Sequence, residues 1–299
     1  MTDTQTPEDR GTLARRTVLA AGGIALTAAG AGTALATGAS AQEGGPKQGA
    51  PKPGAPEDTC YTLTSELVEG PYYIDADKIR RDVTEDQEGV PLALRLKVID
   101  ADTCEPVRNA AVDIWHCNAT GVYSGYEDMG SGGGGGGPTG PPPTDAPTGT
   151  PTGGPPPGGG GGHQEPTDDE RYLRGTWRTD RHGEVTFRTV FPGWYQGRCV
   201  HIHVKVHVDG TWTDAGYEGG HACHTGQLFF DEASVLLSAE VEPYASNSTT
   251  RVTLDEDSIY PDNGHAGGLL YLEYDRRHFA RGVHGRLTLE VATDETHDG

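Results

Sequence analysis

The chain has 299 residues, enough for one large domain or two small ones. Its formal net charge is −21 at pH 7, with 44 acidic against 23 basic side chains. Nucleic acids and anionic membranes attract basic surfaces, so this charge argues against both as partners. It favours solubility and carries no information about the fold.

The first residues have the pattern of an export signal. Arg15 and Arg16 precede an apolar Ala/Gly/Leu run that ends at Leu35, and the small residues of Ala39-Ser40-Ala41 suit a signal peptidase. We predict a twin-arginine-type signal peptide over residues 1–41 and a secreted protein with no stable membrane anchor after cleavage. The alternatives are an ordinary secretory signal or a retained anchor, but the run is less apolar than the roughly 20 residues of a spanning helix.

Composition divides the remainder of the chain. A Gly/Pro/Lys-rich stretch predicts a flexible tether over residues 42–57, followed by one domain over 58–295. Within that domain, a Gly/Pro/Thr tract predicts a disordered insertion at 130–166, because such a composition has almost nothing to bury. The tract interrupts one domain, since the strands before and after it are each too few to close a core.

Five cysteines make an odd set, and no two form a C-x-x-C pair of the kind that binds zinc. In an exported chain we expect one or two disulfides with a thiol left over. The sequence leaves the connectivity open, but Cys199 is expected to be free. The set is Cys60, Cys104, Cys117, Cys199 and Cys223.

Apolar alternation predicts an all-β domain with long loops and little helix. Leu92 to Ile99 and Ala111 to Trp115 both alternate, and we interpret them as an antiparallel pair. Further strands are expected at Glu184 to Thr189, Val200 to Val208 and Arg286 to Val291, with one short helix around Asp231 to Leu237. Short strands joined by Gly/Asp/Pro turns favour a β-sandwich.

The segment from Phe191 to His207 concentrates the residues that carry chemistry. Residues two apart in a strand project from the same face, so His201 and His203 can present imidazoles to one metal ion. The plain alternative is two partly exposed histidines on an edge strand. Upstream stand Tyr195 and Arg198, and a buried arginine beside a metal needs an anion or a developing negative charge as its partner.

Tyrosine ligands would select the metal. A phenol has a pKa near ~10 and ionises at neutral pH only beside a strong Lewis acid, which favours iron(III) over zinc or copper. Tyr123 offers a second phenol just past a strand end. Its alternative interpretation is a core or turn tyrosine.

Several strings together resemble the intradiol ring-cleavage dioxygenases, the family that includes catechol 1,2-dioxygenase and protocatechuate 3,4-dioxygenase. RCVHIH resembles the R-x-x-H-x-H iron signature of that family, and EGPYY resembles its E-G-P-Y segment. DIWHCNATGVYSGY and PGWY resemble the segments that carry its two iron tyrosines, and TGQLFF resembles the strand that follows. In order and rough spacing these strings extend from about Cys60 to Phe230.

The resemblance implies a prealbumin-like antiparallel β-sandwich holding one Fe(3+) per chain. It implies that catechols and O2 are the small-molecule partners and that both oxygen atoms enter the ring, giving cis,cis-muconate-type products. The implied iron ligands are Tyr123, Tyr195, His201 and His203.

The resemblance also implies roles around the metal. Tyr195 would dissociate when substrate arrives, Arg198 would stabilise negative charge on the ring, and Gln227 would donate a hydrogen bond near the oxygen pocket. The implied walls of the substrate cavity are Gly70, Pro71 and Tyr72. The short spacing from Tyr195 to His201 resembles the exported branch of soil bacteria and fungi.

Other functions fit parts of the sequence less well. A cupin needs a glutamate ligand three or four residues after H-x-H, where this chain has Val206 and His207. A non-catalytic transthyretin-like surface binding module would suit the sandwich but not the ordered tyrosines and histidines. His221, Cys223 and His224 suggest a second metal site, for which a loop near a disulfide is the simpler interpretation. The sequence leaves the catechol and the oligomeric state open.

Overall fold

The computed structural model describes residues 63–75, 78–132, 164–260 and 268–297. This part of the chain is mostly strand with little helix, as predicted. The strands are β1 (Pro91–Asp100), β2 (Ala111–Trp115), β3 (Arg174–Arg178), β4 (Glu184–Val190), β5 (His201–Val208), β6 (Thr211–Thr213), β7 (Gly216–Glu218), β8 (His221–Phe229), β9 (Tyr271–Tyr274) and β10 (Val283–Val291). The helices are α1 (Glu232–Ser238) and the 3-10 turns η1 (Glu127–Gly132), η2 (Tyr244–Ser246), η3 (Leu254–Glu256) and η4 (Phe279–Arg281). No helix in these ranges has the length and apolarity to span a bilayer.

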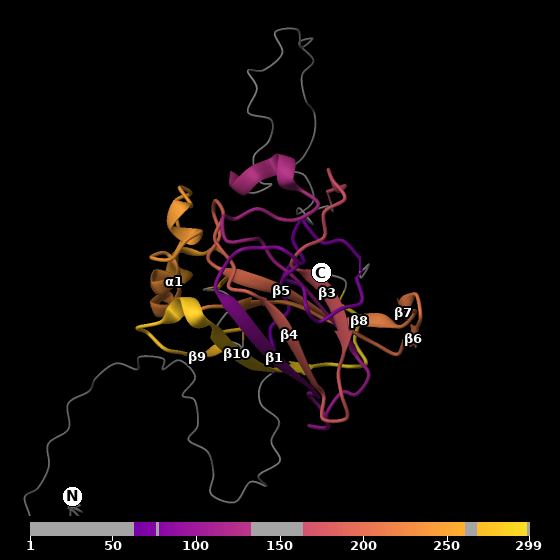
Figure 1. Ribbon diagram of the computed structural model, residues 1–299. Coiled ribbons are helices and arrows are strands. Elements are labelled where there is room, and N and C mark those ends of the chain that lie inside the picture. Colours follow the sequence, from indigo (N-terminus) through magenta and orange to yellow (C-terminus); the bar gives the residue numbers. More distant parts are fainter. Residues whose placement is uncertain (1–62, 76–77, 133–163, 261–267, 298–299) are drawn as a thin grey trace, which may run out of the picture. The chain divides into compact units, whose positions relative to one another are not determined.

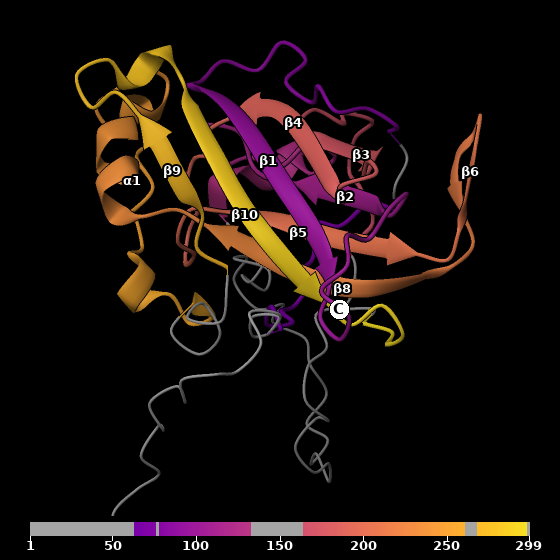
Figure 2. The ribbon, with the colours of Figure 1, turned by 90° about the horizontal axis from the view of Figure 1, so that it is seen from below.

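Two four-stranded sheets share one hydrophobic core. One sheet has the order β4-β1-β10-β9 and the other β3-β2-β5-β8, while β6 and β7 form a separate ribbon that extends from the body (Figures 1 and 2). Alternate side chains of each sheet enter the core, among them Leu94 of β1, Ile114 of β2 and Val204 of β5, each fully buried. Burial of these apolar faces against one another is the main force that holds the two sheets together.

The predicted antiparallel pairing of the first two strands is wrong. β1 pairs with β4 and, in parallel, with β10, whereas β2 pairs with β3 and β5 in the other sheet. Apolar alternation shows which face of a strand is buried and carries no information about its partner. The parallel β1–β10 contact also departs from a purely antiparallel arrangement. Parallel neighbours need a long connection, which the rest of the domain supplies.

Most predicted boundaries fall close to the observed ones. β2 matches its prediction, β4 extends one residue further, and β10 begins three residues earlier. The expected helix is α1, whose N-terminus is capped by the Asp231 side chain accepting from Ser234 N at 2.9 Å. Sequence analysis did not predict β3, β6, β7 or β9.

The described structure extends into both ends of the predicted insertion. Ser131 O accepts a hydrogen bond from Gln196 N at 3.0 Å, and Gln164 O accepts one from Tyr126 OH at 2.8 Å. Residues 130–132 and 164–166 therefore belong to the described fold. The expected signal peptide and tether, and the tract over 133–163, lie outside the described residues and stay predictions.

The cysteines differ in state. Cys104 is disulfide-bonded, and Cys117, Cys199 and Cys223 are buried free thiols, so the expectation of a free Cys199 is confirmed. One disulfide among five cysteines, the lower of the two numbers expected, leaves three thiols, and all three are buried. Cys60 lies outside the described residues.

His221, Cys223 and His224 all lie in strand β8, so the interpretation as a loop is wrong. Within the described residues they belong to no cluster that could hold a metal ion. Successive side chains of a strand face opposite ways. Cys223 enters the hydrophobic core, while His224 Nδ1 lies 2.5 Å from Glu66 Oε1 on the other face.

Candidate active site

The candidate site lies on the outer face of the sheet β3-β2-β5-β8. Ile202 and Val204 of β5 point into the core, so His201 and His203 point the other way. In the sheet, His203 lies between Trp115 of β2 and Gln227 of β8. This outer face would be exposed in a bare sheet, but here the two imidazoles are only 2% exposed. The strand thus places both histidines in a closed environment.

Three donor atoms converge in that environment. Tyr195 OH lies 3.2 Å from His201 Nε2, and His201 Nε2 lies 3.1 Å from His203 Nε2. His201 Nδ1 lies 2.7 Å from the carbonyl of Cys199, which can only accept, so the proton of a neutral His201 resides on Nδ1. The Nε2 lone pair is then directed at its neighbours. Three oxygen and nitrogen donors this close together can bind one cation in place of the protons that they share.

Tyr123 completes the group. Its ring makes an edge contact with the ring of Tyr195 at 5.6 Å and with that of His203 at 6.2 Å, and it stacks on Tyr72 at 4.6 Å. The Tyr123 hydroxyl is buried and makes no hydrogen bond of normal geometry in the described structure, and its polar neighbour is Tyr195. A buried polar atom without a partner is costly, which is the mark of a donor that awaits a ligand. All four predicted ligands therefore come together.

The site holds these four groups neutral. Burial lowers the pKa of His201 to about 3 and that of His203 well below its ordinary value, with the nearby charge of Arg198 adding to both effects. Burial raises the pKa of Tyr123 and of Tyr195 well above the ordinary value of a phenol. A phenol in this setting becomes an anion only when a strong cation binds it.

Metal binding at this site would depend on the tyrosine oxygens. Within the described ranges, no cluster of three or more His, Cys, Asp or Glu side chains has a metal-binding arrangement. Two imidazoles alone make a weak site, so a bound metal would need the oxygens of Tyr123 and Tyr195. Oxygen and imidazole donors without thiolate suit a hard ion such as iron(III).

Arg198 is held by two side chains. Its Nε donates to Asp257 Oδ2 at 2.9 Å and its Nη2 donates to Gln227 Oε1 at 2.5 Å. Burial alone would lower the pKa of Arg198, but Tyr195 and Asp257 raise it above the ordinary value. The guanidinium is therefore a fixed positive charge beside the four donors. Gln227 also donates to Val68 O at 3.1 Å, so its contacts orient Arg198 and the covering segment.

The expected cavity walls lie beside the donors. Gly70 has φ +80°, and a Cβ there would come within 3.2 Å of His203 Cε1. Pro71 O accepts from Gln164 N at 3.2 Å, and Tyr72 stacks on Tyr123. A side chain at position 70 would therefore crowd the imidazole, which explains why glycine suits it.

Three residues that position the site were not predicted from the sequence. Trp115 stacks on His203 with ring centroids 4.9 Å apart and planes 9° apart. Buried Arg174 donates from Nη1 to Tyr72 O at 2.7 Å and from Nη2 to Ser124 O at 2.8 Å, so it ties two site segments together. Asp257 fixes Arg198. Trp115 stood within a recognised string, whereas Arg174 and Asp257 had no local signal.

One family model matches part of the chain. The family model described as "Dioxygenase" matches residues 68–132, which include Tyr123 and Gly70 but not the segment with Tyr195 and the histidines. A search of curated proteins found no match.

Two solved structures resemble the chain over most of its length. An intradiol ring-cleavage dioxygenase from Tetranychus urticae is 29% identical with a TM-score of 0.61, covering 79% of this chain and 98% of that one. A second dioxygenase is 28% identical with a TM-score of 0.62, covering 80% of this chain and 98% of its own.

Proposed function

Because the chain is a relative of the intradiol ring-cleavage dioxygenases in sequence and in fold, we propose that it is a non-haem iron(III) dioxygenase. It opens catechol-type rings between the two hydroxyl-bearing carbons and inserts both atoms of O2, giving cis,cis-muconate-type products. The observation that carries the proposal is that His201 Nε2 lies 3.2 Å from Tyr195 OH and 3.1 Å from His203 Nε2, beside the buried hydroxyl of Tyr123.

The donor set fits one iron(III) per chain. Tyr123, Tyr195, His201 and His203 would hold it, and their burial excludes the water that would hydrate a free ion. When bound, iron(III) would ionise the phenols and draw electron density from a catecholate, making the ring reactive towards O2.

The two tyrosines have different surroundings, which suggests different roles. Tyr123 is fixed by its stack on Tyr72 and by the neighbouring Ser124, whose backbone and hydroxyl bind Arg174. Tyr195 precedes Gln196 and Gly197, both exposed. In our proposal Tyr195 is the tyrosine that moves, and its oxygen accepts a proton from the incoming catechol.

Arg198 supplies positive charge where the ring becomes electron-rich. Its ion pair with Asp257 does not remove this role, because Asp257 also accepts a hydrogen bond from Cys199 N at 2.7 Å and has other donors to satisfy it. The Arg198 charge is thus oriented in advance, as transition-state stabilisation requires.

The basic groups around the site favour an uncharged catechol as substrate. Lys205 is paired with Glu69, Arg198 with Asp257, and Arg174 donates to backbone carbonyls. With these partners, none of the three side chains is placed to bind a carboxylate on a substrate ring. The net charge of −21 also repels anions at long range.

Two further parts of the proposal rest on the sequence and the family. The two facing sheets would make a prealbumin-like sandwich, the arrangement that the resemblance implies. Export by the twin-arginine route would carry the folded, metal-loaded protein out of the cell, where plant-derived catechols are met.

Purified holoenzyme tests the proposal. We expect about one iron per chain, a visible band from phenolate-to-iron(III) charge transfer, and oxygen uptake on catechol. With 18O2, the ring-opened product should carry two labelled oxygen atoms. A colourless protein without iron that still binds catechols would contradict the proposal and favour a transthyretin-like binding module.

A further inference from the structure

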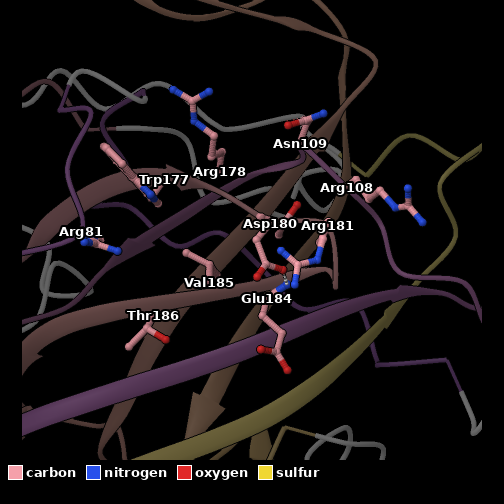
Figure 3. Close-up of a pocket in the computed structure, with 11 residues that line it drawn as sticks. Arg81, Arg108, Asn109, Trp177, Arg178, Asp180, Arg181, Glu184, Val185 and Thr186 are labelled. Carbon is pink, nitrogen blue, oxygen red and sulfur yellow. Dashed lines mark hydrogen bonds between the residues drawn. The ribbon is translucent and has the colours of Figure 1, made fainter.

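A concave site lies away from the candidate active site. A cleft of about 430 Å³ is lined by residues of β3, β4, the turn between them and the loop before β2, together with Arg81. Figure 3 shows Trp177, Arg178 and Arg81 on one side of it and Arg108 and Arg181 on the other. No candidate active-site residue lines this cleft.

The topology explains why the cleft exists. β3 and β4 are edge strands of different sheets, joined by a short turn. Residues 79–83 bridge part of the gap between these edges: Arg80 N donates to Thr176 O of β3, and Arg188 N of β4 donates to Arg81 O. Nearer the turn between β3 and β4, side chains rather than backbone line the gap between the two strand edges. The cleft therefore lies between two strand edges, and its arginines come from β3, the turn after it, the loop before β2 and residues 79–83.

Four arginines surround this cleft without ion-pair partners. Within the described residues, no carboxylate lies within 4.0 Å of the charged nitrogens of Arg81, Arg108, Arg178 or Arg181. The chain has 44 acidic residues for 23 basic ones, so partners are abundant elsewhere. Four arginines without a carboxylate partner around one cleft are therefore unusual in a chain with this excess of acidic residues.

The two carboxylates in the cleft are already engaged. Asp180 Oδ1 accepts from His182 N at 2.7 Å and from Glu184 N at 3.0 Å, which closes the turn. Glu184 Oε2 accepts from Arg95 at 2.5 Å, and Arg95 is not one of the four arginines of the cleft. The cleft therefore keeps a surplus of positive charge.

Tryptophan rings help to hold two of the guanidinium groups. Arg81 lies over the Trp177 ring at 5.9 Å from its centroid, and Arg178 lies over the Trp212 ring at 5.3 Å. Stacking on an indole leaves the in-plane N–H groups of arginine free to donate. Such an arrangement presents guanidinium forks to a planar anion.

We propose that this cleft binds a carboxylate-rich ligand at a site separate from the candidate active site. Paired N–H groups of arginine match the two oxygens of a carboxylate, and the volume suits a small molecule or a few units of a polymer. Two sources share this chemistry: a free dicarboxylate, or the uronate units of an acidic polysaccharide. The proposal does not depend on the dioxygenase activity.

Calorimetric titration of the full-length protein with adipate and with oligogalacturonate tests the proposal, and adipamide serves as the uncharged comparison. We expect a carboxylate probe to bind, adipamide not to bind, and affinity to fall as salt increases. Binding of adipate would assign the site to free dicarboxylates. Binding of oligogalacturonate alone would assign it to the polymer.

The decisive variant is Arg178→Gln with Arg181→Gln. Loss of two charge-assisted contacts should weaken binding about tenfold or more, with melting temperature and catechol turnover unchanged because both side chains are exposed. The matched control is Arg276→Gln with Arg277→Gln, exposed arginines after β9, which changes net charge equally. It should retain binding within twofold. No carboxylate binding, or equal loss in both double variants, would overturn the proposal.

Discussion

The two four-stranded sheets of this protein differ in what covers their outer faces. On β1, Leu94 and Leu96 are buried while Arg95 and Lys97 are exposed, the pattern of a sheet with one face in water. On β5 both faces are buried, because the segment over 63–75 lies across the outer one: Leu67 N donates to Thr225 O on neighbouring β8. The sheet that contains β1 contributes only to the core, whereas the sheet that contains β5 also carries the candidate site on its covered outer face.

The same strand therefore combines two kinds of residue. The inward side chains of β5 contribute hydrophobic burial, and the outward His201 and His203 belong to the candidate active site in a buried environment. Mutations on the two faces should accordingly separate stability from activity, and mutations on the exposed face of β1 should affect neither.

The largest effect is expected on the covered face. His203→Ala should remove most of the iron and lower turnover about a thousandfold or more, since the metal contributes several kcal/mol to the transition state. Iron analysis and oxygen uptake measure both. His207→Ala, on the same face of β5, is the control and should keep iron. Equal iron loss in both variants would show that any substitution on this face releases iron.

The next effect separates charge from metal binding. Arg198→Ala should keep iron and the visible band and still bind catechol, but turnover should fall about a hundredfold, as for a lost transition-state donor. Arg198→Lys should recover part of the rate. Iron content, spectral titration and turnover are measured on one preparation. Full turnover per bound iron in Arg198→Ala would exclude Arg198 from the reaction.

Buried Asp113 on the covered face of β2 should make stability depend on pH. Burial raises its pKa to about 7 from an ordinary 3.8, so between these values the folded chain holds a proton that the unfolded chain has released. The free energy of unfolding should therefore fall as pH rises from about 4 to 7, by at most about 1.4 kcal/mol per pH unit.

Denaturant titration across this range should show a flatter dependence in Asp113→Asn than in the wild type. Parallel curves for the two proteins would show that Asp113 does not titrate within the window.

The inward face of β5 should respond in stability alone. Val204→Ala leaves a cavity in the core shared by the two sheets and should lower the free energy of unfolding by about 2 kcal/mol. Iron per folded chain and turnover should stay near the wild-type values. Thermal melting followed by iron analysis measures both, and iron loss in the folded fraction would show that the two faces are coupled.

The smallest effect is expected on the exposed face of β1. Arg95 pairs with Glu184, but its side chain is 60% exposed, so Arg95→Ala should change stability by less than about 0.5 kcal/mol. Chemical denaturation measures it. A change several times larger would mean that the outer face of this sheet is covered in solution.

Local patterns in the sequence were sufficient for much of the site. The H-x-H spacing places His201 and His203 on one face wherever the strand lies, because side chains alternate along any strand. The ordered strings around Tyr123 and Tyr195 identified the two phenols. Arg174 and Asp257 had no such signal, since their importance comes from contacts with residues far away in the chain.

The sequence by itself determined the β class and the position of most strands, because these follow from periodicity. It also indicated the four candidate donor residues, through strings that resemble the motifs of a known family. Only the tertiary structure decided that β1 and β2 belong to different sheets, that β1 runs parallel to β10, and that Arg198 is held between Asp257 and Gln227. Strand partners and the covering of a sheet face depend on which distant segments bury the most apolar surface together. No local pattern contains that information.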